Sequence, residues 1–413
     1  MLNFQLKTFP NGLRLITAPL SNTKAVTVLF LVGVGSRYET QQLNGISHFL
    51  EHMFFKGTKK RPKTLDIARA LDAVGASYNA FTSEEHTGFF VRAAAEHFEL
   101  ALDILFDMLY GSKFAPEEIE KEKGVIGEEI NMYQDNPQSY IAEVAKKLFY
   151  GEQPLGRQVT GLKETVQKFS QKDFFRYRNN FYTPDNLVVA VAGGQNKIPW
   201  QEKIQEFFQK IEIERKGSFK KVKEAQTKPG VLLHYKETDQ AHLILGFRTL
   251  PRTDKRRPVL KVLNNLFGEN MSSRLFTEVR ERRGLAYYVS SEMADFQDAG
   301  VFGASAGVDI RRVEEAIKVI LAEFQKLKNQ DFAAEELKKA KENLKGRLYL
   351  GLEESFAVAE FLAEQKLFWD KIDHPEELVK KYEKVQKKRI KKIGPGIFHP
   401  QEFKFSHYWS LQR

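Results

Sequence analysis

The stretch His48-Phe49-Leu50-Glu51-His52 carries more information than any other in this 413-residue chain. Two histidines four residues apart lie on the same side of a helix, because an α-helix makes one turn every 3.6 residues. Glu51 is three residues from His48 and next to His52, so its carboxylate reaches the same region. Two imidazoles, a nearby carboxylate and a more distant third ligand are the components of a catalytic zinc site. The alternative is an amphipathic helix whose histidines only border a core.

A candidate third ligand lies about 76 residues downstream, in a second stretch with a helical pattern. This stretch begins at Pro116, has acidic residues in its first turn, and ends by Asn136-Pro137, which are typical helix boundaries. Glu122 and Glu129 are seven residues apart, so two helical turns bring them onto one face. The spacing suits a metal ligand, Glu129, and a carboxylate that orients the site, Glu122.

The residues of this second helix, taken alone, allow two interpretations of its carboxylate face. We expect Val125, Ile126 and Ile130 to be buried, so the carboxylate face is not wholly exposed to solvent. Lys121 and Lys123 stand nearby, however, and a surface helix rich in Glu and Lys explains the same pattern. The histidine pair upstream favours the metal site.

Two runs of sequence around the histidine pair support this interpretation. They are Gly33-Val34-Gly35-Ser36-Arg37-Tyr38-Glu39 and Asn44-Gly45-Ile46-Ser47-His48-Phe49-Leu50-Glu51-His52-Met53-Phe54-Phe55-Lys56-Gly57-Thr58. Both are similar to the pitrilysin family of peptidases, which includes insulin-degrading enzyme, mitochondrial processing peptidase with its beta subunit, and small bacterial processing proteases. The H-x-x-E-H pattern is the inverzincin signature. The resemblance extends over nearly the whole chain.

The resemblance implies roles for individual residues. The third zinc ligand of the family, 77 positions after the second His, falls on Glu129, and an orienting Glu seven residues earlier falls on Glu122. The stretch 75–83 resembles the family's edge strand, on which a peptide substrate lies. Asn79 and Ala80 match the positions that contact the peptide backbone.

Composition sets limits on architecture and location. A chain of this length exceeds what one core usually supports, so two domains of about 200 residues are expected. The absence of Cys excludes disulfides and thiol catalysis. The first residues lack the layout of a signal peptide, and the longest apolar run, 25–35, is too short for a membrane span. We therefore expect a soluble, cytoplasmic chain with no membrane partner.

The formal net charge of +10 raises nucleic acid as a possible partner. The basic clusters are 59–63 and 380–392, and no aromatic-interleaved nucleic-acid motif accompanies them. In the second cluster Leu378, Tyr382 and Val385 recur at helical spacing, so its Lys and Arg residues form a solvated face. We expect no nucleic-acid partner.

Gly33 and Gly35 follow an apolar stretch, 26–32, as the glycines of a dinucleotide-binding loop do. A lone G-x-G is a weak signal, and Tyr38 occupies the position of the third glycine. The pattern therefore predicts a turn at the end of a strand.

A weak internal repeat predicts two homologous domains. The stretch from Gly75 aligns with the stretch from Gly284, and Phe114-Ala-Pro-Glu-Glu-Ile aligns with Phe332-Ala-Ala-Glu-Glu-Leu. Each half opens with strands and carries helices in its middle, including long ones at 96–110 and 313–327. We expect an α+β fold in which each domain is a mainly antiparallel sheet packed with helices. The expected boundaries are a zinc-binding catalytic domain at 1–215, a lysine-rich linker at 216–230 and a degenerate repeat domain at 231–413.

The repeat places metal chemistry in the first half only. At the position of Glu129 the second half has Arg347, and the counterpart of the histidine pair is near Lys261-Val-Leu-Asn-Asn265. If the fold needed His and Glu at these positions for packing, the second half would keep similar residues. It does not keep them.

The second half contains a different signature, 272–287, which resembles the C-terminal motif of the family. The resemblance implies that Arg280 and Tyr287 bind substrate backbone and stabilise the transition state. A Tyr hydroxyl can donate to a developing oxyanion, and Arg can fix peptide carbonyls. The glycine-rich loop of the noncatalytic mitochondrial processing subunit is missing, since Phe267-Gly268-Glu269-Asn270 stands in its place. Specificity for presequences is therefore not expected.

These patterns together predict a zinc metalloendopeptidase that cleaves extended peptides or unfolded protein segments. One Zn²⁺ per chain is held by His48, His52 and Glu129, with Glu51 as general base. The similar bacterial proteases pair two chains into a closed four-domain chamber, so we expect a homodimer. The main alternative is a noncatalytic structural or processing-complex subunit of the same family. A heterodimer is disfavoured because one chain carries both halves of the site.

Overall fold

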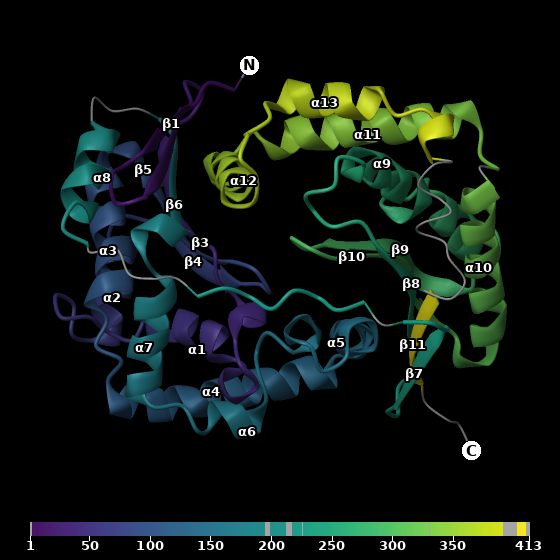
Figure 1. Ribbon diagram of the computed structural model, residues 1–413, viewed down its shortest axis with the longest axis horizontal. Coiled ribbons are helices and arrows are strands. Elements are labelled where there is room, and N and C mark those ends of the chain that lie inside the picture. The colour runs from purple at the N-terminus through teal and green to yellow at the C-terminus, as the bar shows by residue number, and fades with distance from the viewer. Residues whose placement is uncertain are drawn as a thin grey trace. The chain divides into compact units, whose positions relative to one another are not determined.

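The computed structural model describes residues 2–194, 199–211, 217–224, 226–329, 331–390 and 403–409 (Figure 1). These residues form two compact units, each with its own sheet. Unit 1 consists of Met1–Asn131, Arg157–Lys220 and Leu350–His374. Unit 2 consists of Met132–Gly156, Lys221–Tyr349 and Pro375–Arg413.

Unit 1 is built on a six-stranded sheet in the order β1-β2-β6-β3-β5-β4. Only β2 and β6 pair in parallel, and every other neighbouring pair is antiparallel. In this order β4 is an edge strand, and in the described part of the chain it pairs with β5 alone. The strands are β1 (Gln5–Thr8), β2 (Arg14–Pro19), β3 (Ala25–Val32), β4 (Ser77–Thr82), β5 (Thr87–Ala94) and β6 (Leu187–Gly193).

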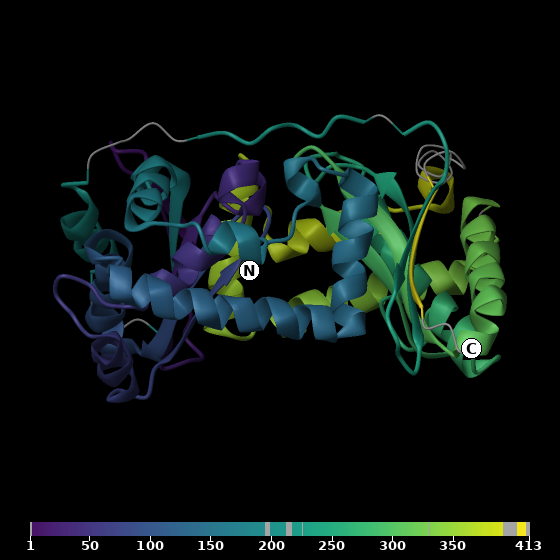
Figure 2. The ribbon, with the colours of Figure 1, turned by 90° about the horizontal axis from the view of Figure 1, so that it is seen from below.

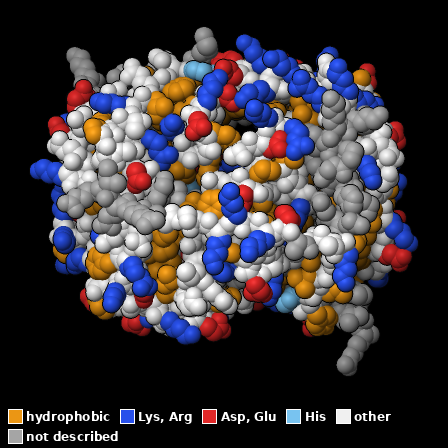
Figure 3. Space-filling view, viewed as in Figure 1, with side chains coloured by type: hydrophobic (Ala, Val, Ile, Leu, Met, Phe, Trp, Pro, Cys, Tyr) orange, Lys and Arg blue, Asp and Glu red, His pale blue; other side chains and the backbone are white. Residues whose placement is uncertain are grey.

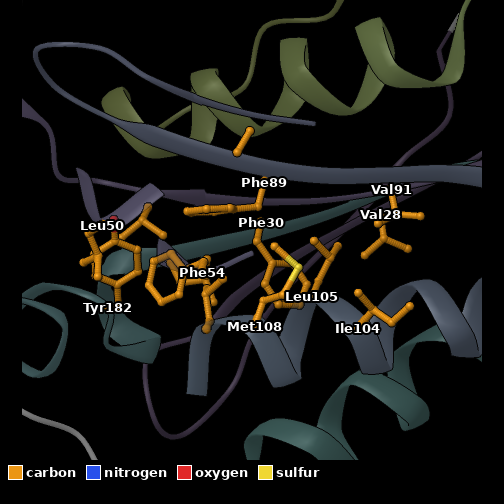
Figure 4. Packing of buried hydrophobic residues seen from close by; sticks show 14 of the residues in the cluster. Val28, Phe30, Leu50, Phe54, Phe89, Val91, Ile104, Leu105, Met108 and Tyr182 are labelled. Atoms are coloured by element: carbon orange, nitrogen blue, oxygen red, sulfur yellow. The ribbon is translucent and has the colours of Figure 1, made fainter. Parts of the chain in front are cut away.

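Helices cover both faces of this sheet. The helix α3 (Phe98–Gly111) packs on one face, where Ile104 lies near Val28, and Leu105 and Met108 lie near Phe30 (Figure 4). The helix α12 (Ser355–Phe368) packs on the other face through a second apolar cluster. The other helices of this unit are α1 (Ile46–Met53), α2 (Thr64–Asp72), α6 (Lys163–Val166), α7 (Gln171–Phe181), α8 (Trp200–Phe208) and most of α4 (Pro116–Asp135).

Unit 2 repeats the same plan with a five-stranded sheet in the order β7-β11-β8-β10-β9. Here β7 and β11 pair in parallel and the other pairs are antiparallel. The helix α5 (Pro137–Tyr150) packs on one face, while α9 (Arg257–Gly268) and α10 (Val313–Asn329) belong to the core on the other. The remaining elements are β7 (Gly230–Tyr235), β8 (Ala241–Thr249), β9 (Ala286–Asp295), β10 (Gly300–Val308), β11 (Phe403–Trp409), α11 (Ala334–Gly351) and α13 (Pro375–Glu383). The predicted α+β class with two mainly antiparallel sheets is confirmed.

Each compact unit includes a segment from the sequence half that forms the other unit. Residues 132–156, with α5, pack in unit 2, and residues 350–374, with α12, pack in unit 1. The reason is that each sheet needs an apolar helix on its second face, and the chain supplies that helix from the opposite half. The division into 1–215 and 231–413 stays a prediction about sequence domains, and Lys216 and Ala225 of the expected linker lie outside the described residues.

The basic clusters differ in their surroundings. Lys60 and Arg61 of the first cluster are paired with Asp103 and Asp107 of α3, at N–O distances of 2.5 to 2.8 Å. The described Lys and Arg residues of the second cluster are exposed, while Val385 beside them is buried, as a solvated face requires. Figure 3 shows Lys and Arg side chains gathered over α11 and α13. Lys391 and Lys392 lie outside the described residues.

No helix in the described part of the chain is both long enough and apolar enough to cross a bilayer.

Candidate metal centre

The helix α1 presents the histidine pair, and a carboxylate outside the helix fixes where α1 begins. Gly45, at the N-cap, has φ +99°, and a Cβ there would lie 2.7 Å from the Thr160 carbonyl oxygen. The Glu39 carboxylate accepts hydrogen bonds from the backbone N–H groups of Gly45 and Ser47, both at 2.8 Å. It thereby satisfies amide groups that the first turn of a helix leaves without partners.

His48 and His52 leave this helix in the same direction, with ring centroids 4.7 Å apart. Glu129 of α4 faces both imidazoles: its Oε1 lies 3.5 Å from His48 Nε2, and its Oε2 lies 3.5 Å from His52 Nε2. One ligand atom from each residue lies within 4.8 Å of the other two. Among the residues that the structure describes, this is the one group with such geometry.

Glu122 holds the second histidine from the side opposite Glu129. Its Oε1 lies 2.9 Å from His52 Nδ1, and its Oε2 lies 2.6 Å from Lys56 Nζ. Burial alone would raise the pKa of Glu122, but the hydrogen bonds from His52 and Lys56 lower it below the ordinary value. Glu122 is therefore ionised and can only accept, so His52 donates from Nδ1 and its neutral form keeps the Nε2 lone pair toward Glu129.

The donor set fits a zinc ion: two imidazole nitrogens and one carboxylate, with a hydrogen-bonded carboxylate fixing one tautomer. The imidazole of His48 lowers the pKa of Glu129, which keeps that carboxylate ionised as a ligand must be. Burial alone would lower the pKa of His52, but its hydrogen bond to Glu122 and the nearby carboxylate charges raise it. The carboxylates of Glu51, Glu122 and Glu129 near His52 thus favour a positive charge at the site.

The long helix α4 is unbroken between Pro116 and Asp135, as the sequence predicted (Figure 2). Glu128 is exposed and accepts a hydrogen bond from Asn131, so its side chain points away from the histidines. Ile126 and Ile130 are buried as expected, but Val125 is 52% exposed, and that prediction was wrong. Val125 is one turn before Glu129 and lies on the same open side of the helix.

Glu51 lies beside the two histidines, one turn along from His48. Burial raises its pKa, and a hydrogen bond from the Thr82 hydroxyl to Oε2, 2.6 Å long, partly offsets that rise. A carboxylate with a raised pKa next to a metal site is suited to accepting and returning a proton.

The strand that carries Asn79 and Ala80 is the edge strand β4, in agreement with the expectation of an edge strand. Asn79 is exposed, and the backbone N–H of Ala80 donates to its side-chain oxygen, Oδ1, at 2.9 Å. The contact of these residues with a peptide stays a prediction.

Arg280 and Tyr287 lie together in unit 2. Arg280 is in a short π-helix, Phe276–Glu281, and its guanidinium carbon lies 5.9 Å from the centroid of the Tyr287 ring. Tyr287 is in the edge strand β9 and is 75% exposed. Tyr287 is thus presented at the surface, whereas Arg280 is half-buried, and the roles of both stay a prediction.

The counterpart of the metal centre in unit 2 is filled by a polar network. Glu269 accepts hydrogen bonds from Asn264 at 2.6 Å and from Asn265 at 3.1 Å, and Arg347 lies 3.6 Å from it. The position of Glu129 in the repeat is thus taken by a cation paired with an anion. Glu269 is thus the common partner of Asn264, Asn265 and Arg347.

Three contacts at this centre involve residues to which the sequence gave no role: Glu39, Lys56 and Thr82. Lys56 follows His52 by four residues but lies beyond the end of α1 at Met53, so helical spacing does not identify it. Glu39 and Thr82 are brought to α1 by tertiary structure, and no local pattern identifies them.

Comparisons with known proteins agree with this geometry. Residues 14–162 match the family described as Insulinase (Peptidase family M16), and residues 168–344 match the Peptidase M16 inactive domain. A chain from Bacillus subtilis, named uncharacterized zinc protease YmxG, is 35% identical over 391 residues, which is 95% of each chain. An uncharacterized zinc protease of Streptomyces coelicolor is 38% identical over 375 residues, covering 88% of this chain and 80% of that protein.

Solved structures share the fold. The crystal structure of a protease from Helicobacter pylori superposes with a TM-score of 0.92 at 24% identity, covering 98% of this chain and 99% of that one. A peptidase M16 inactive domain from Pseudomonas fluorescens gives a TM-score of 0.89 at 16% identity, covering 100% of this chain and 98% of that one. With both family models matched in order and relatives similar over nearly their full length, the chain belongs to peptidase family M16, the insulinase or pitrilysin family.

Proposed function

We propose that this protein is a zinc-dependent endopeptidase that cleaves extended peptides or unfolded protein segments. The observation that carries the proposal is the convergence of His48, His52 and Glu129 within 4.8 Å, with Glu51 beside them. His48, His52 and Glu129 would hold the ion, one per chain. A zinc ion in such a site supplies Lewis acidity, which polarises a carbonyl and lowers the pKa of a water molecule.

The chain's own residues supply the rest of the chemistry. Glu51 takes a proton from the attacking water and later delivers one to the leaving amine. Thr82 occupies one oxygen of this carboxylate, so Oε1 is the oxygen left for the proton. Glu122 keeps His52 in the required tautomer, and Lys56 keeps Glu122 ionised.

The peptide would be held by β-augmentation on β4. An extended chain can pair with the outer edge of this strand, which recognises backbone more than sequence. The Asn79 side chain would then give up its bond to the Ala80 N–H, and that amide would bind the peptide instead. Only unfolded or extended segments can pair in this way.

Arg280 and Tyr287 would bind the substrate backbone and donate to the developing oxyanion, as the family resemblance implies. Tyr287 is exposed enough to reach a substrate. In this proposal two chains form a homodimer that encloses the site in a chamber.

The test is metal analysis of the purified protein combined with a fluorogenic peptide assay. We expect about one zinc per chain and cleavage that a chelator abolishes and zinc restores. The fold should survive chelation, because only three side chains anchor the ion and both units have extensive cores without it. Full activity in a metal-free preparation would contradict the proposal. Zinc binding without cleavage of any extended peptide would favour the noncatalytic subunit.

A further inference from the structure

The proposed general base, Glu51, accepts a hydrogen bond from a residue of the strand β4. The Thr82 hydroxyl donates to Glu51 Oε2 at 2.6 Å, a short distance that is typical of hydrogen bonds to a carboxylate. The side chain of Glu51 has three rotatable bonds, so without such a contact its oxygens are free to occupy several positions.

Thr82 reaches Glu51 because β4 packs on α1. Ala80 and Thr82 are two residues apart and therefore lie on the same face of β4. Ala80 is buried in the same apolar core as Leu50 of α1, next to Glu51 in the sequence. The packing of β4 against α1 brings the Thr82 hydroxyl to the carboxylate.

Thr82 is itself held rigidly. It pairs with Thr87 at the end of the β4–β5 ladder. The turn that follows is fixed by backbone hydrogen bonds from Ser36 to Ser83 and from Arg37 to Glu84, at 3.1 and 3.0 Å, while Arg37 forms a buried ion pair with Glu85. Gly35 allows this approach, since a Cβ there would lie 2.2 Å from the Ser83 carbonyl oxygen.

We infer that Thr82 is a positioning residue for Glu51: it fixes Oε2 and so orients the carboxylate for proton transfer. The inference rests on the proposed function, because it concerns how the proposed base acts. It also connects two parts of the site, since Thr82 lies on the strand that would bind the peptide, about 7 Å beyond Ala80 at the usual rise per residue. One rigid strand then sets both the peptide register and the position of the base.

The test compares Thr82→Val with Thr82→Ser. Valine keeps the shape and the strand preference of threonine but cannot donate, while serine keeps the hydroxyl. We expect Thr82→Val to lower kcat about 10- to 100-fold, the usual range for a lost hydrogen bond to a charged group, with KM nearly unchanged. Thr82→Ser should retain most of the wild-type kcat.

Two further measurements separate positioning from a structural role. Zinc content, and the affinity of the metal-free chain for an uncleaved peptide, should be the same in Thr82→Val and the wild type. Thr87→Val is the matched control: Thr87 is the cross-strand partner of Thr82, and its hydroxyl donates to the Val34 carbonyl instead of Glu51. This control should lower stability without the fall in kcat.

The inference is overturned if Thr82→Val has wild-type kcat, or if it loses kcat only together with zinc or peptide binding. It is equally overturned if Thr82→Ser is as impaired as Thr82→Val. Each of these outcomes leaves a zinc-dependent wild-type enzyme intact. Failure of the proposed function itself would appear differently, as peptide cleavage by the wild-type protein that a chelator does not inhibit.

Discussion

The carboxylates around the histidine pair have different environments, which suit the different roles proposed for them. Burial raises the pKa of Glu51 above its ordinary value. The neighbouring His48 lowers the pKa of Glu129, and the hydrogen bonds from His52 and Lys56 lower that of Glu122 despite its burial. A carboxylate with a raised pKa is suited to carrying a proton, whereas carboxylates with lowered pKa values stay ionised. This assignment agrees with Glu51 as base and Glu129 as ligand.

The first prediction at this scale concerns Glu51→Gln. The amide keeps the shape of the side chain but cannot take a proton, so zinc content should stay near wild type while kcat falls about 10²- to 10⁴-fold. Metal analysis and the peptide assay on the same preparation measure both. An active Glu51→Gln protein would exclude Glu51 as the base.

The second prediction uses two neighbouring glutamates as a matched pair. Glu129→Gln should lower zinc occupancy, because a neutral amide is a weaker ligand than a carboxylate and Glu129 faces both imidazoles. Glu128→Gln should bind zinc normally, since that side chain is exposed. Titration with a competing chelator gives the zinc affinities of both variants. The opposite result would identify Glu128 as the ligand in place of Glu129.

At the scale of the element, the position of α1 depends on a carboxylate from outside the helix. Glu39 is buried and accepts from Gly45, Ser47 and the Asn44 side chain, so the N-terminus of α1 is fixed ahead of His48. A short helix with two ligands on one face holds them in place only if its own axis is fixed.

This anchor should make stability depend on pH. Burial raises the pKa of Glu39 from 4.5 to about 7, so the folded chain binds this proton more tightly than the unfolded chain does. The contribution to stability is therefore fully present below pH 4.5 and is lost as pH rises through about 7. Glu39→Gln removes the titration. The difference in free energy of unfolding between wild type and variant should fall by up to about 3 kcal/mol across that window.

Urea unfolding of the metal-free proteins at several pH values measures this difference. Glu128→Gln, at an exposed position on α4, serves as the control and should follow the wild type. A difference between wild type and Glu39→Gln that stays constant with pH would contradict the prediction.

At the scale of the whole molecule, each half of the chain completes the other half's unit. The helix α12, from the C-terminal half, covers apolar residues of the unit 1 sheet that include Ile16, Leu29 and Val188. A fragment 1–215 would expose this face to water, so we expect it to aggregate. Supplying a peptide with residues 350–374 should restore solubility, measured by sedimentation. A soluble, folded fragment without this peptide would contradict the prediction.

The last prediction concerns the proposed homodimer. In the homodimer proposed above, Arg280 and Tyr287 of one chain would act at the zinc site of the other chain. Inactive Glu51→Gln and Tyr287→Phe chains, mixed together, should then regain activity, because one site of a mixed dimer has both parts intact. With random mixing half of the dimers are mixed, so about a quarter of wild-type activity is the ceiling. No recovery in mixed dimers that demonstrably form would mean that the pair acts within its own chain.

The sequence by itself predicted the α+β class, the two-fold repeat, the bounds of α4 and the three candidate ligands. These features depend on short-range spacing: four residues between the histidines, seven between Glu122 and Glu129, and Pro at each end of a helix. Helical geometry converts such spacings directly into direction, whereas the choice of Glu129 as a ligand also needed the histidine pair 77 residues upstream.

Only the tertiary structure decided which distant residues support the site and which helix covers which sheet. Thr82 and Glu39 reach α1 through strand packing and a turn, and α5 and α12 pack on the sheet of the opposite half. Val125 had the apolar character of a core residue, yet its side of α4 is open. The physical reason is that local pattern fixes the direction of a side chain relative to its own element, whereas its partners depend on which apolar faces are buried together.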